Sequence, residues 1–290
     1  WSGMRLEGRG ILITGASLGL GKAIASACVD EGAHVFLCAR GAESLEKTRT
    51  ELLARARPGQ KIAALAADVS RPEEAARLME SALAALPAFH GLVNNAGIYG
   101  PQGLLEETDW QDWVRTIETN LYGTAFLCRA AIPVMRKLGY GKIVNLSGGG
   151  ASGPLPRFSA YAASKGAIVH LTETLAHELK GSGIDINALA PGPLNTRLLD
   201  QVLAAGPQKL GPDIYDKALK QKKDGGAPPE RGAALCAYLL SDASDGITGR
   251  LLSAMLDGWE TLADHRAEVA SGDIYTLRRV VPKDRGLCWS

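Results

Sequence analysis

Short apolar runs alternate along the chain with longer segments in which apolar residues recur every three or four positions. The runs predict strands that are buried on both faces, and the longer segments predict amphipathic helices. Strands are expected at residues 10–14, 34–38, 61–66, 91–94, 142–146, 184–189 and 250–256. Helices are expected at residues 22–31, 42–56, 109–138, 159–180 and 229–240, with another starting at 71. This alternation predicts an α/β fold: a doubly wound, seven-stranded parallel sheet with helices on both faces.

The chain is long enough for one large domain. It has 290 residues, of which 46% are hydrophobic, and we expect a single unit spanning residues 1–290. Residues 193–228 carry two glycine–proline breaks and are expected to form an irregular loop beside the substrate. Residues 259–290 follow the last strand, and this extension either closes its own core, covers a pocket or contacts a neighbouring subunit.

Charge and cysteine content narrow the class of partner. The 32 lysine and arginine residues are balanced by 31 acidic residues, so a net charge of +1 gives no electrostatic basis for binding nucleic acid. We expect no membrane span and no secretion signal, because no apolar stretch approaches about 20 residues and no basic region precedes one. The five cysteines are widely spaced without a histidine cluster, which predicts reduced thiols in a cytoplasmic protein and no metal site.

A glycine-rich turn follows the first strand, with the sequence Thr14-Gly15-Ala16-Ser17-Leu18-Gly19-Leu20-Gly21. Glycines there let the backbone approach a pyrophosphate, and the amides at the start of the next helix attract an anion. We therefore expect a dinucleotide cofactor to contact Gly15, Ser17, Leu18, Gly19 and Gly21. Such a turn also occurs in methyltransferases and for packing alone, so the motif needs support from other positions.

The next three strands also end at residues expected to line this cofactor. Arg40 follows the second strand, where a site for NAD usually has an acid and a site for NADP has an arginine for the 2′-phosphate. This predicts NADP, with the use of NAD left open. Asp68 and Val69 follow the third strand and are expected near the adenine, although an aspartate there is also a common turn residue. Asn95 follows the fourth strand and is expected to hold a tight bend beside the cofactor.

Tyr161 and Lys165 are four positions apart near the start of a predicted helix, so they share one of its faces. A free tyrosine has a pKa of about 10 and is a poor base at neutral pH, whereas a nearby ammonium favours the phenolate and lowers that pKa. Tyr161 is therefore predicted to be a general acid or base. The spacing occurs by chance in long chains, and its weight comes from its place after the fifth strand, at the ligand-binding edge of the sheet.

Together these motifs resemble the short-chain dehydrogenase/reductase family, in its single-domain Rossmann branch. The resemblance spans about residues 8–258 and rests on seven matches in chain order: Thr14-Gly15 to Gly21, Asp68, Asn94 to Gly97, Asn120, Tyr161 with Lys165, Pro191-Gly192 with Thr196, and Ile247-Thr248-Gly249. It implies an NADP(H)-dependent oxidoreductase that moves a hydride between nicotinamide and a carbonyl or secondary alcohol. It also implies a small-molecule substrate and assembly as a homodimer or homotetramer.

The resemblance implies roles for individual residues. Tyr161 would donate the proton to the carbonyl oxygen, and Lys165 would bond the nicotinamide ribose and lower the tyrosine pKa. Asn120 would help to hold a water that relays protons to Lys165. Thr196 would bond the nicotinamide carboxamide, with Pro191 beside it. An apolar substrate pocket would be formed by Pro154, Leu155, Phe158, Leu194, Leu198 and Leu199.

One family position is not matched. The serine that bonds the substrate oxygen usually precedes the tyrosine by thirteen positions, where this chain has Gly148. Because consecutive glycines make a shift of register easy, we expect Ser147 to take this role, with Ser152 and Ser159 as alternatives.

The same gap supports a second hypothesis, a nucleotide-sensing or scaffold protein that kept the fold and lost catalysis. The intact Tyr161, Lys165 and Asn120 favour the enzyme. A methyltransferase would have an acid where Arg40 stands, so that hypothesis is disfavoured.

Overall fold

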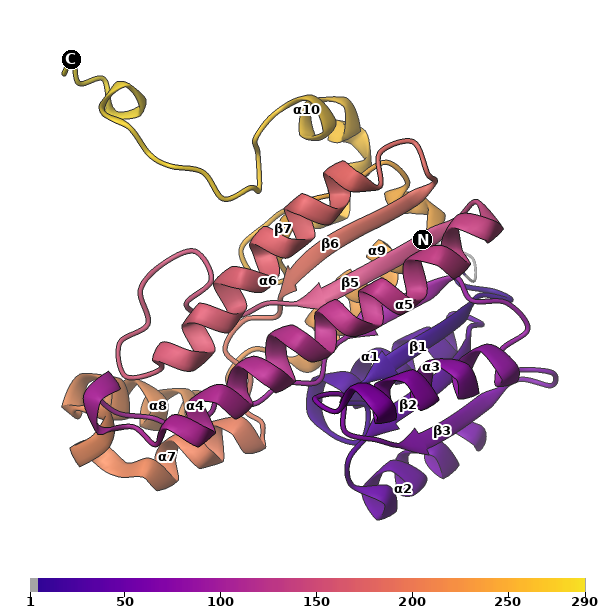
Figure 1. Ribbon diagram of the computed structural model, residues 1–290, viewed down its shortest axis with the longest axis horizontal. Helices are drawn as coiled ribbons and strands as arrows, with labels where there is room; N and C mark the ends of the chain where they lie inside the picture. The colour runs from indigo at the N-terminus through magenta and orange to yellow at the C-terminus, as the bar shows by residue number, and fades with distance from the viewer. Residues whose placement is uncertain (1–4, 290) are drawn as a thin grey trace.

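The strands form a single parallel sheet, as predicted. The computed structural model describes residues 5–289, and within them the strands are β1 (Gly10–Thr14), β2 (His34–Ala39), β3 (Ile62–Ala66), β4 (Gly91–Asn94), β5 (Gly141–Leu146), β6 (Ile184–Ala190) and β7 (Leu251–Ser253). Their order is β3-β2-β1-β4-β5-β6-β7 (Figure 1). Because this order reverses between β1 and β4, ligands are expected beyond the carboxyl ends of the strands. Residues 1–4 and 290 of the expected 1–290 unit lie outside the described residues.

Helices cover both faces of the sheet because the central strands are apolar on both sides (Figure 1). In β1, Ile11 and Ile13 join one hydrophobic core and Leu12 joins the other. The first core also receives side chains from α1 (Gly19–Asp30), α2 (Ala42–Leu53) and α9 (Pro229–Leu240). The second receives side chains from α3 (Pro72–Ala85), α5 (Gly123–Leu138) and α6 (Ser159–Glu178). Burial of these side chains, at roughly 25 cal/mol per Å² of apolar surface, holds the three layers together.

The helix expected at 109–138 is present, but it is divided into three segments. It consists of α4 (Trp110–Ile117), a π-helical turn (Glu118–Tyr122) and α5. The carboxylate of Asp109 caps its start by accepting a 2.9 Å hydrogen bond from the Asp112 amide, and Gly139 ends it in the left-handed conformation. Helical turns of the π type are rare and frequent at functional sites, and this one carries Asn120.

The expectation of an irregular loop at 193–228 is wrong. Most of this segment forms two helices, α7 (Arg197–Leu210) and α8 (Pro212–Asp224). The glycine–proline pairs mark a kink and a boundary rather than a loop. Gly206 has a φ of 76° and bends α7, whereas Gly211, with a φ of 77°, lets the chain turn before Pro212 starts α8.

The C-terminal extension divides into two parts. Trp259 is buried and contacts Tyr238, with ring centroids 5.9 Å apart, and the Tyr275 carbonyl accepts a 2.8 Å hydrogen bond from the Leu251 amide of β7. This part closes the core and contains a 3₁₀ segment (Trp259–His265) and α10 (Arg266–Ser271). The last residues run away from the body of the molecule, and Trp289 is exposed (Figure 1). Other 3₁₀ segments span Leu105–Glu107, Asp242–Ser244 and Pro282–Arg285.

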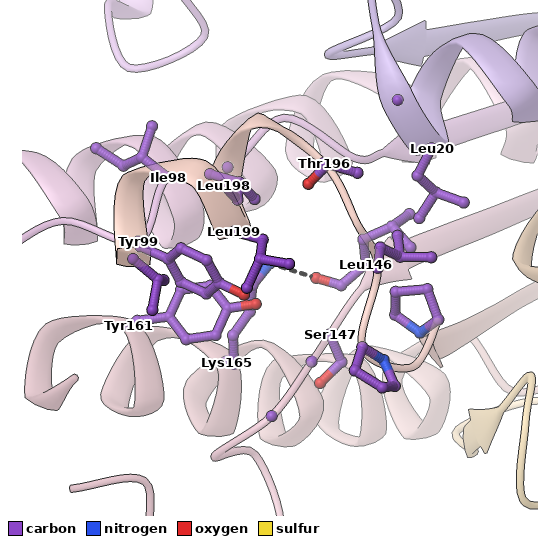
Figure 2. Close-up of a pocket in the computed structure, with 18 of the residues that line it drawn as sticks. Leu20, Ile98, Tyr99, Leu146, Ser147, Tyr161, Lys165, Thr196, Leu198 and Leu199 are labelled. Carbon is purple, nitrogen blue, oxygen red and sulfur yellow. Dashed lines mark hydrogen bonds between the residues drawn. The ribbon is translucent and has the colours of Figure 1, made fainter. Parts of the chain in front are cut away.

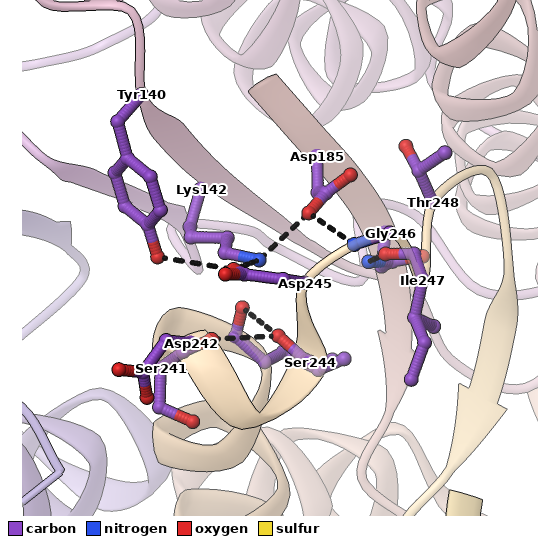
Figure 3. A network of polar contacts seen from close by, with 12 residues as sticks. Tyr140, Lys142, Asp185, Ser241, Asp242, Ser244, Asp245, Gly246, Ile247 and Thr248 are labelled. Carbon is purple, nitrogen blue, oxygen red and sulfur yellow. Dashed lines mark hydrogen bonds and ion pairs between the residues drawn. The ribbon is translucent and has the colours of Figure 1, made fainter. Parts of the chain in front are cut away.

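An ionic network joins β5 and β6 at the amino ends of the strands (Figure 3). Lys142 is almost fully buried, and its Nζ lies 2.7 Å from Asp185 Oδ2 and 2.7 Å from Asp245 Oδ1. The Gly246 amide donates a 3.0 Å hydrogen bond to Asp185, and the Tyr140 hydroxyl donates to Asp245. A buried charge needs such partners, so the network fixes the loop before β7 against the sheet.

Four cysteines are free and buried in the described part of the chain, whereas Cys288 is free and exposed. Among residues 5–289, no three or more histidine, cysteine or acidic side chains gather as metal ligands would. None of the described helices combines the length and the apolar character that a membrane crossing requires.

Candidate active site

The carboxyl ends of the central strands open onto one cavity of about 1650 Å³. With the exception of Asn120, every predicted site residue lines it. These residues are Gly15, Ser17, Leu18, Gly19, Gly21, Arg40, Asp68, Val69, Asn95, Ser147, Tyr161, Lys165, Pro191 and Thr196. The structure therefore brings together positions that are as far apart in sequence as 15 and 196.

The glycine turn after β1 is held by the loop after β4. The Asn95 amide nitrogen Nδ2 donates to the Thr14 and Gly15 carbonyls at 2.9 and 3.1 Å. Gly15 has a φ of 64°, and a Cβ on Gly21 would lie 2.1 Å from the Gly15 carbonyl oxygen. No side chain caps the start of α1 at Leu18, so its first amides are open to the cavity. Tight glycine packing and open amides fit a pyrophosphate.

Arg40 and Asp68 lie at the cavity beyond the ends of β2 and β3. Arg40 is exposed and forms no ion pair or hydrogen bond with a described residue. Asp68 accepts hydrogen bonds from the Ser70 amide and hydroxyl at 3.0 and 2.7 Å. Burial opposes ionisation of Asp68, but those hydrogen bonds and the charges of Arg40 and Arg71 lower its pKa overall. Arg40 thus lies at the cavity without a hydrogen bond or ion pair to a described residue, and its charge favours the ionised form of Asp68.

Thr196 connects the far side of the cavity to the glycine turn. It precedes α7, and a Cβ on Gly19 would lie 3.2 Å from its Cγ2 atom. Pro191 is the first residue after β6, and it contacts α9. A Cβ on Gly232 of α9 would lie 3.3 Å from the Cβ of Pro191. The chain between them therefore spans the cavity close to the backbone of the glycine turn.

Tyr161 and Lys165 lie on the face of α6 that faces the cavity (Figure 2). Tyr161 is 9% exposed and Lys165 is 5% exposed. Lys165 Nζ donates a 2.7 Å hydrogen bond to the carbonyl of Leu146, the last residue of β5, and lies 5.6 Å from the centre of the Tyr161 ring. The four-residue spacing thus brings the ammonium beside the phenol, as predicted from the sequence.

The expected lowering of the Tyr161 pKa by Lys165 is not observed. Burial, and after it the neighbouring Tyr99, raise the pKa of the Tyr161 phenol. Burial lowers the pKa of the Lys165 ammonium to about 8. Removal from water favours the neutral form of each group, and burial is the largest cause of both shifts. At neutral pH Tyr161 is therefore a protonated phenol, which is the form of a proton donor.

Asn120 lies behind the cavity wall rather than in it. Its Oδ1 accepts a 2.8 Å hydrogen bond from the Ile98 amide, and its Nδ2 donates to the Ile98 carbonyl and to Ser164 Oγ at 2.9 Å each. A Cβ on Gly97 would lie 3.2 Å from Asn120 Oδ1 and 3.6 Å from Lys165 Nζ, so both groups surround one point. The side chain of Asn120 thus fixes the loop after β4 next to Lys165.

The glycine at the unmatched family position faces the tyrosine. A Cβ on Gly148 would lie 2.5 Å from the Tyr161 hydroxyl oxygen. The Ser147 amide donates a 2.8 Å hydrogen bond to the Leu189 carbonyl and so continues the pairing of β5 with β6. The Ser147 side chain points away from the Tyr161 hydroxyl (Figure 2). Its own hydroxyl is buried and has no hydrogen-bond partner among residues 5–289. The substrate-binding role of Ser147 stays a prediction.

Of the two alternative serines, one is hydrogen-bonded to another side chain and the other is exposed. Ser159 Oγ accepts a 3.1 Å hydrogen bond from the Trp113 indole. Ser152 lines the cavity but is exposed. Neither side chain has the buried position of a hydroxyl that serves Tyr161.

Sequence reasoning missed Tyr99, whose ring is in edge contact with that of Tyr161 at a centroid distance of 4.6 Å. The two hydroxyls lie at the same end of this pair (Figure 2). The signal that could have found Tyr99 is its position two residues after the Asn-Asn-Ala-Gly motif, at the carboxyl edge of the sheet.

The part of the cavity beyond Tyr161 is mostly apolar. One side of an apolar cluster there is formed by Tyr161 of α6 and by Phe158, which directly precedes α6. The other side of this cluster is formed by residues of α7 and α8. The residues expected to form the substrate pocket all line the cavity: Pro154, Leu155, Phe158, Leu194, Leu198 and Leu199. The helices that replaced the expected loop at 193–228 therefore build a wall of the site.

Comparison with known proteins agrees with this geometry. The short chain dehydrogenase family model matches residues 9–205. L-fucose dehydrogenase of Oryctolagus cuniculus is 34% identical over 293 residues, covering 98% of this chain and 94% of the relative. 3beta-Hydroxysteroid dehydrogenase 1 of Eggerthella lenta is 36% identical over 264 residues, covering 89% of this chain and 95% of the relative.

A solved structure from Beutenbergia cavernae is also similar. It is described as a candidate NAD(P)-dependent gluconate 5-dehydrogenase with NADP bound at low occupancy, and it has a TM-score of 0.76 at 31% identity. The match covers 87% of this chain and 96% of that one. The chain therefore belongs to the short-chain dehydrogenase family, whose members are NAD(P)-dependent oxidoreductases that act on CH–OH and C=O groups.

Proposed function

We propose that this chain is an NADP(H)-dependent oxidoreductase that reduces a ketone, or oxidises the corresponding secondary alcohol, with Tyr161 as proton donor or acceptor. The observation that carries the proposal is the burial of Tyr161 beside Lys165 at the wall of the same cavity onto which the glycine turn opens. A bound nicotinamide would supply the hydride, and the chain's own residues provide position, electrostatics and the proton.

The cofactor would extend along the carboxyl ends of the strands. The amides of α1 and the tight glycine turn support a pyrophosphate site formed by Gly15, Ser17, Leu18, Gly19 and Gly21. The adenosine would lie against Asp68, Val69 and Asn95. The nicotinamide end would lie near Tyr161 and Lys165, with Pro191 and Thr196 on its other side.

Arg40 is the basis for preferring NADP over NAD. Its guanidinium lies at the cavity edge beyond β2 and forms no hydrogen bond or ion pair with a described residue, so it is available for a 2′-phosphate. No acid follows β2, where Arg40 directly succeeds Ala39, so the usual acceptor for a ribose 2′-hydroxyl is missing there. NADP bound to the relative from Beutenbergia cavernae is in line with this preference.

The proton for the substrate oxygen would come from Tyr161. Its raised pKa keeps the phenol protonated at neutral pH, as donation to a developing oxyanion requires. Lys165, with a pKa of about 8, is mostly an ammonium at neutral pH and can return a proton to Tyr161. Asn120 supports that relay, because its Oδ1 and Lys165 Nζ both lie close to the position that a Cβ on Gly97 would occupy.

The substrate would be a mostly apolar carbonyl compound of medium size. Phe158, Leu199, Val202 and Leu210 form a buried cluster together with Tyr161. Such a wall favours a hydrocarbon skeleton over a sugar, because it offers few partners for hydroxyl groups. Of the two relatives, 3beta-hydroxysteroid dehydrogenase 1 is named for a steroid and L-fucose dehydrogenase for a sugar. The apolar wall therefore favours a substrate of the steroid kind.

The experiment that tests this proposal is a turnover assay at 340 nm with the full chain. NADPH oxidation is followed with cyclohexanone, 1-decalone and 5α-androstane-3,17-dione, and with a keto-sugar as the polar comparison. We expect turnover with the apolar ketones and faster turnover with NADPH than with NADH. Tight NADPH binding without turnover of any carbonyl would favour the alternative, a sensor or scaffold protein that has lost catalysis, which the glycine at position 148 motivates.

Three further features stay predictions from the sequence: a single catalytic unit over residues 1–290, a homodimer or homotetramer, and a cytoplasmic location.

A further inference from the structure

The position opposite the Tyr161 hydroxyl has no side chain. A Cβ at Gly148 would point at that hydroxyl, so residue 148 occupies the place from which a second donor would reach a substrate oxygen bound to Tyr161. The neighbouring Ser147 is directed away from it (Figure 2). A proton donor acting alone would leave the second lone pair of the substrate oxygen without a partner from this side.

Tyr99 brings a hydroxyl to the same end of the site from the opposite direction. Its ring contacts Tyr161 edge to face, with centroids 4.6 Å apart and planes at 64°. Both side chains line the cavity, and neither hydroxyl is hydrogen-bonded to another described residue. Figure 2 shows both phenol oxygens at the same end of the ring pair. Both hydroxyls are therefore turned toward the same part of the cavity.

The backbone on either side of Tyr99 is fixed. Asn120 binds both the amide and the carbonyl of Ile98, at 2.8 and 2.9 Å. Gly100, with a φ of 69°, packs so closely on α4 that a Cβ there would lie 1.8 Å from Thr116 Oγ1. Such constraints preorganise a side chain that binds a reacting group.

The Tyr99 ring is fixed as well. It contacts the Phe158 ring at a centroid distance of 5.5 Å, in addition to its contact with Tyr161. Tyr99 is thus held between two aromatic rings of the substrate wall. Its hydroxyl has a defined position relative to the Tyr161 hydroxyl, although it lies on a loop.

We propose that Tyr99 is a second catalytic residue, whose hydroxyl donates a hydrogen bond to the substrate oxygen in place of the side chain that Gly148 lacks. The inference rests on the proposed function. During reduction the carbonyl carbon gains the hydride, the oxygen gains the proton of Tyr161, and the C=O π bond is lost. Tyr99 keeps its proton throughout and stabilises the charge that develops on the oxygen.

The protonation of the two phenols suits this division of roles. Burial raises the pKa of Tyr99, so it remains a donor at neutral pH. A negative charge on either phenol disfavours a charge on the other, which is how Tyr99 contributes to the raised pKa of Tyr161. When Tyr161 has given up its proton, Tyr99 therefore stays protonated.

The test compares Tyr99→Phe with the unaltered chain, using the fastest ketone of the apolar panel. This change removes one oxygen and keeps the ring contacts. We expect kcat to fall about 10- to 100-fold, the range for losing one hydrogen bond to a charged oxygen. The Kd for NADPH, from its fluorescence, and the Tm should stay unchanged, which a merely structural role would not allow. Tyr215→Phe is the matched control, because Tyr215 packs on the same cluster without lining the cavity.

Ser147→Ala separates the two candidate donors, and we expect it to lose less activity than Tyr99→Phe. Tyr99→Phe with kcat within about threefold of the unaltered chain would overturn the inference and leave the proposed function standing. A large loss of kcat in Ser147→Ala but not in Tyr99→Phe would assign the role to Ser147. That result too would overturn the inference and leave the proposed function standing. Absence of turnover by the unaltered chain would overturn the proposed function, and this inference with it.

Discussion

The hydroxyl oxygen of Tyr161 lies where the side chain of residue 148 would be, 2.5 Å from the position of a Cβ on Gly148. Glycine at 148 is therefore what allows the phenol to adopt this position. A side chain at residue 148 would clash with the Tyr161 hydroxyl unless the tyrosine moved.

Gly148→Ala tests that relationship. The added methyl group should push the phenol out of place, and because a shift of about 1 Å can cost 100-fold, we expect kcat to fall about 10- to 100-fold. Affinity for NADPH should change little. Gly153→Ala, in the same loop, is the control, since a Cβ there meets nothing within 4 Å. Steady-state kinetics of both variants decide the point, and equal activities would show that the phenol has room to adjust.

Cofactor choice is predicted to depend on Arg40. Arg40→Asp removes a charged partner of the 2′-phosphate and introduces repulsion, so we expect the Kd for NADPH to rise about 10- to 100-fold. The Kd for NADH should stay constant or fall, because its ribose hydroxyl can donate to the new carboxylate. Arg71→Ala is the control, since Arg71 also acts on Asp68 but does not line the cavity. Equal losses for both nucleotides in a fluorescence titration would refute the phosphate role.

The pH dependence of turnover should follow Lys165. Its pKa of about 8 means that the ammonium, which reprotonates Tyr161, is lost as the pH rises through that value. We therefore expect kcat for ketone reduction to decline above about pH 8, and kcat for alcohol oxidation to rise over the same interval. The measurement is a pair of kcat profiles between pH 6 and 10. A reduction rate that is flat across pH 8 would contradict the relay.

The free energy of unfolding should also depend on the protonation of Lys165. Burial lowers the pKa of Lys165 from 10.5 to about 8, so between these values the folded chain binds fewer protons than the unfolded chain. Stability therefore rises with pH across that window as far as Lys165 is concerned. Lys165→Met removes the buried charge, and at pH 7 we expect it to be more stable by about 2 kcal/mol after the lost hydrogen bond to Leu146 is allowed for.

Urea unfolding at pH 7 and pH 10 measures this difference. The advantage of Lys165→Met should be largest at pH 7 and shrink toward pH 10, and Lys180→Met, at an exposed position, should show no such trend. An advantage that is independent of pH would mean that packing rather than charge is responsible.

The arrangement of the core was predictable because strand residues alternate between two hydrophobic clusters. Ile11, Leu12 and Ile13 are all apolar, and such a run in a βα pattern has few solutions other than a doubly wound sheet. The glycine turn and Arg40 were predictable for a related reason, since each directly follows a strand and parallel strands present such residues at one edge. Tyr161 and Lys165 were predictable from their four-residue spacing near the start of the helix that follows β5.

What the sequence did not predict depends on contacts between distant segments. The part of Tyr99 in the site depends on its contact with the ring of Tyr161, some 60 positions away, and on Asn120, which fixes its loop. The helices α7 and α8 were missed because glycine–proline pairs that usually interrupt helices here mark a kink at Gly206 and a new start at Pro212. The direction of the Tyr161 pKa depends on burial, which the four-residue spacing to Lys165 does not reveal.

The network at the opposite edge of the sheet should affect stability and leave cofactor binding unchanged. Asp185→Ala removes one of the two carboxylates that neutralise the buried Lys142, and we expect a loss of about 2–4 kcal/mol in urea unfolding. Asp245→Ala should cost less, because about half of the Asp245 side chain is exposed to water. NADPH affinity should be unaltered in both. If Asp245→Ala is as costly as Asp185→Ala, burial does not set the energetics of this cluster.

The role of Tyr161 is tested most directly by the turnover of Tyr161→Phe, which removes the proposed proton donor and keeps the aromatic ring. With the fastest ketone and saturating NADPH, we expect kcat to fall about 10²- to 10⁴-fold, the usual contribution of a positioned acid. The Kd for NADPH should remain within about threefold. A Tyr161→Phe variant that reduces the ketone at nearly the rate of the unaltered chain would contradict the role of Tyr161 and the mechanism built on it.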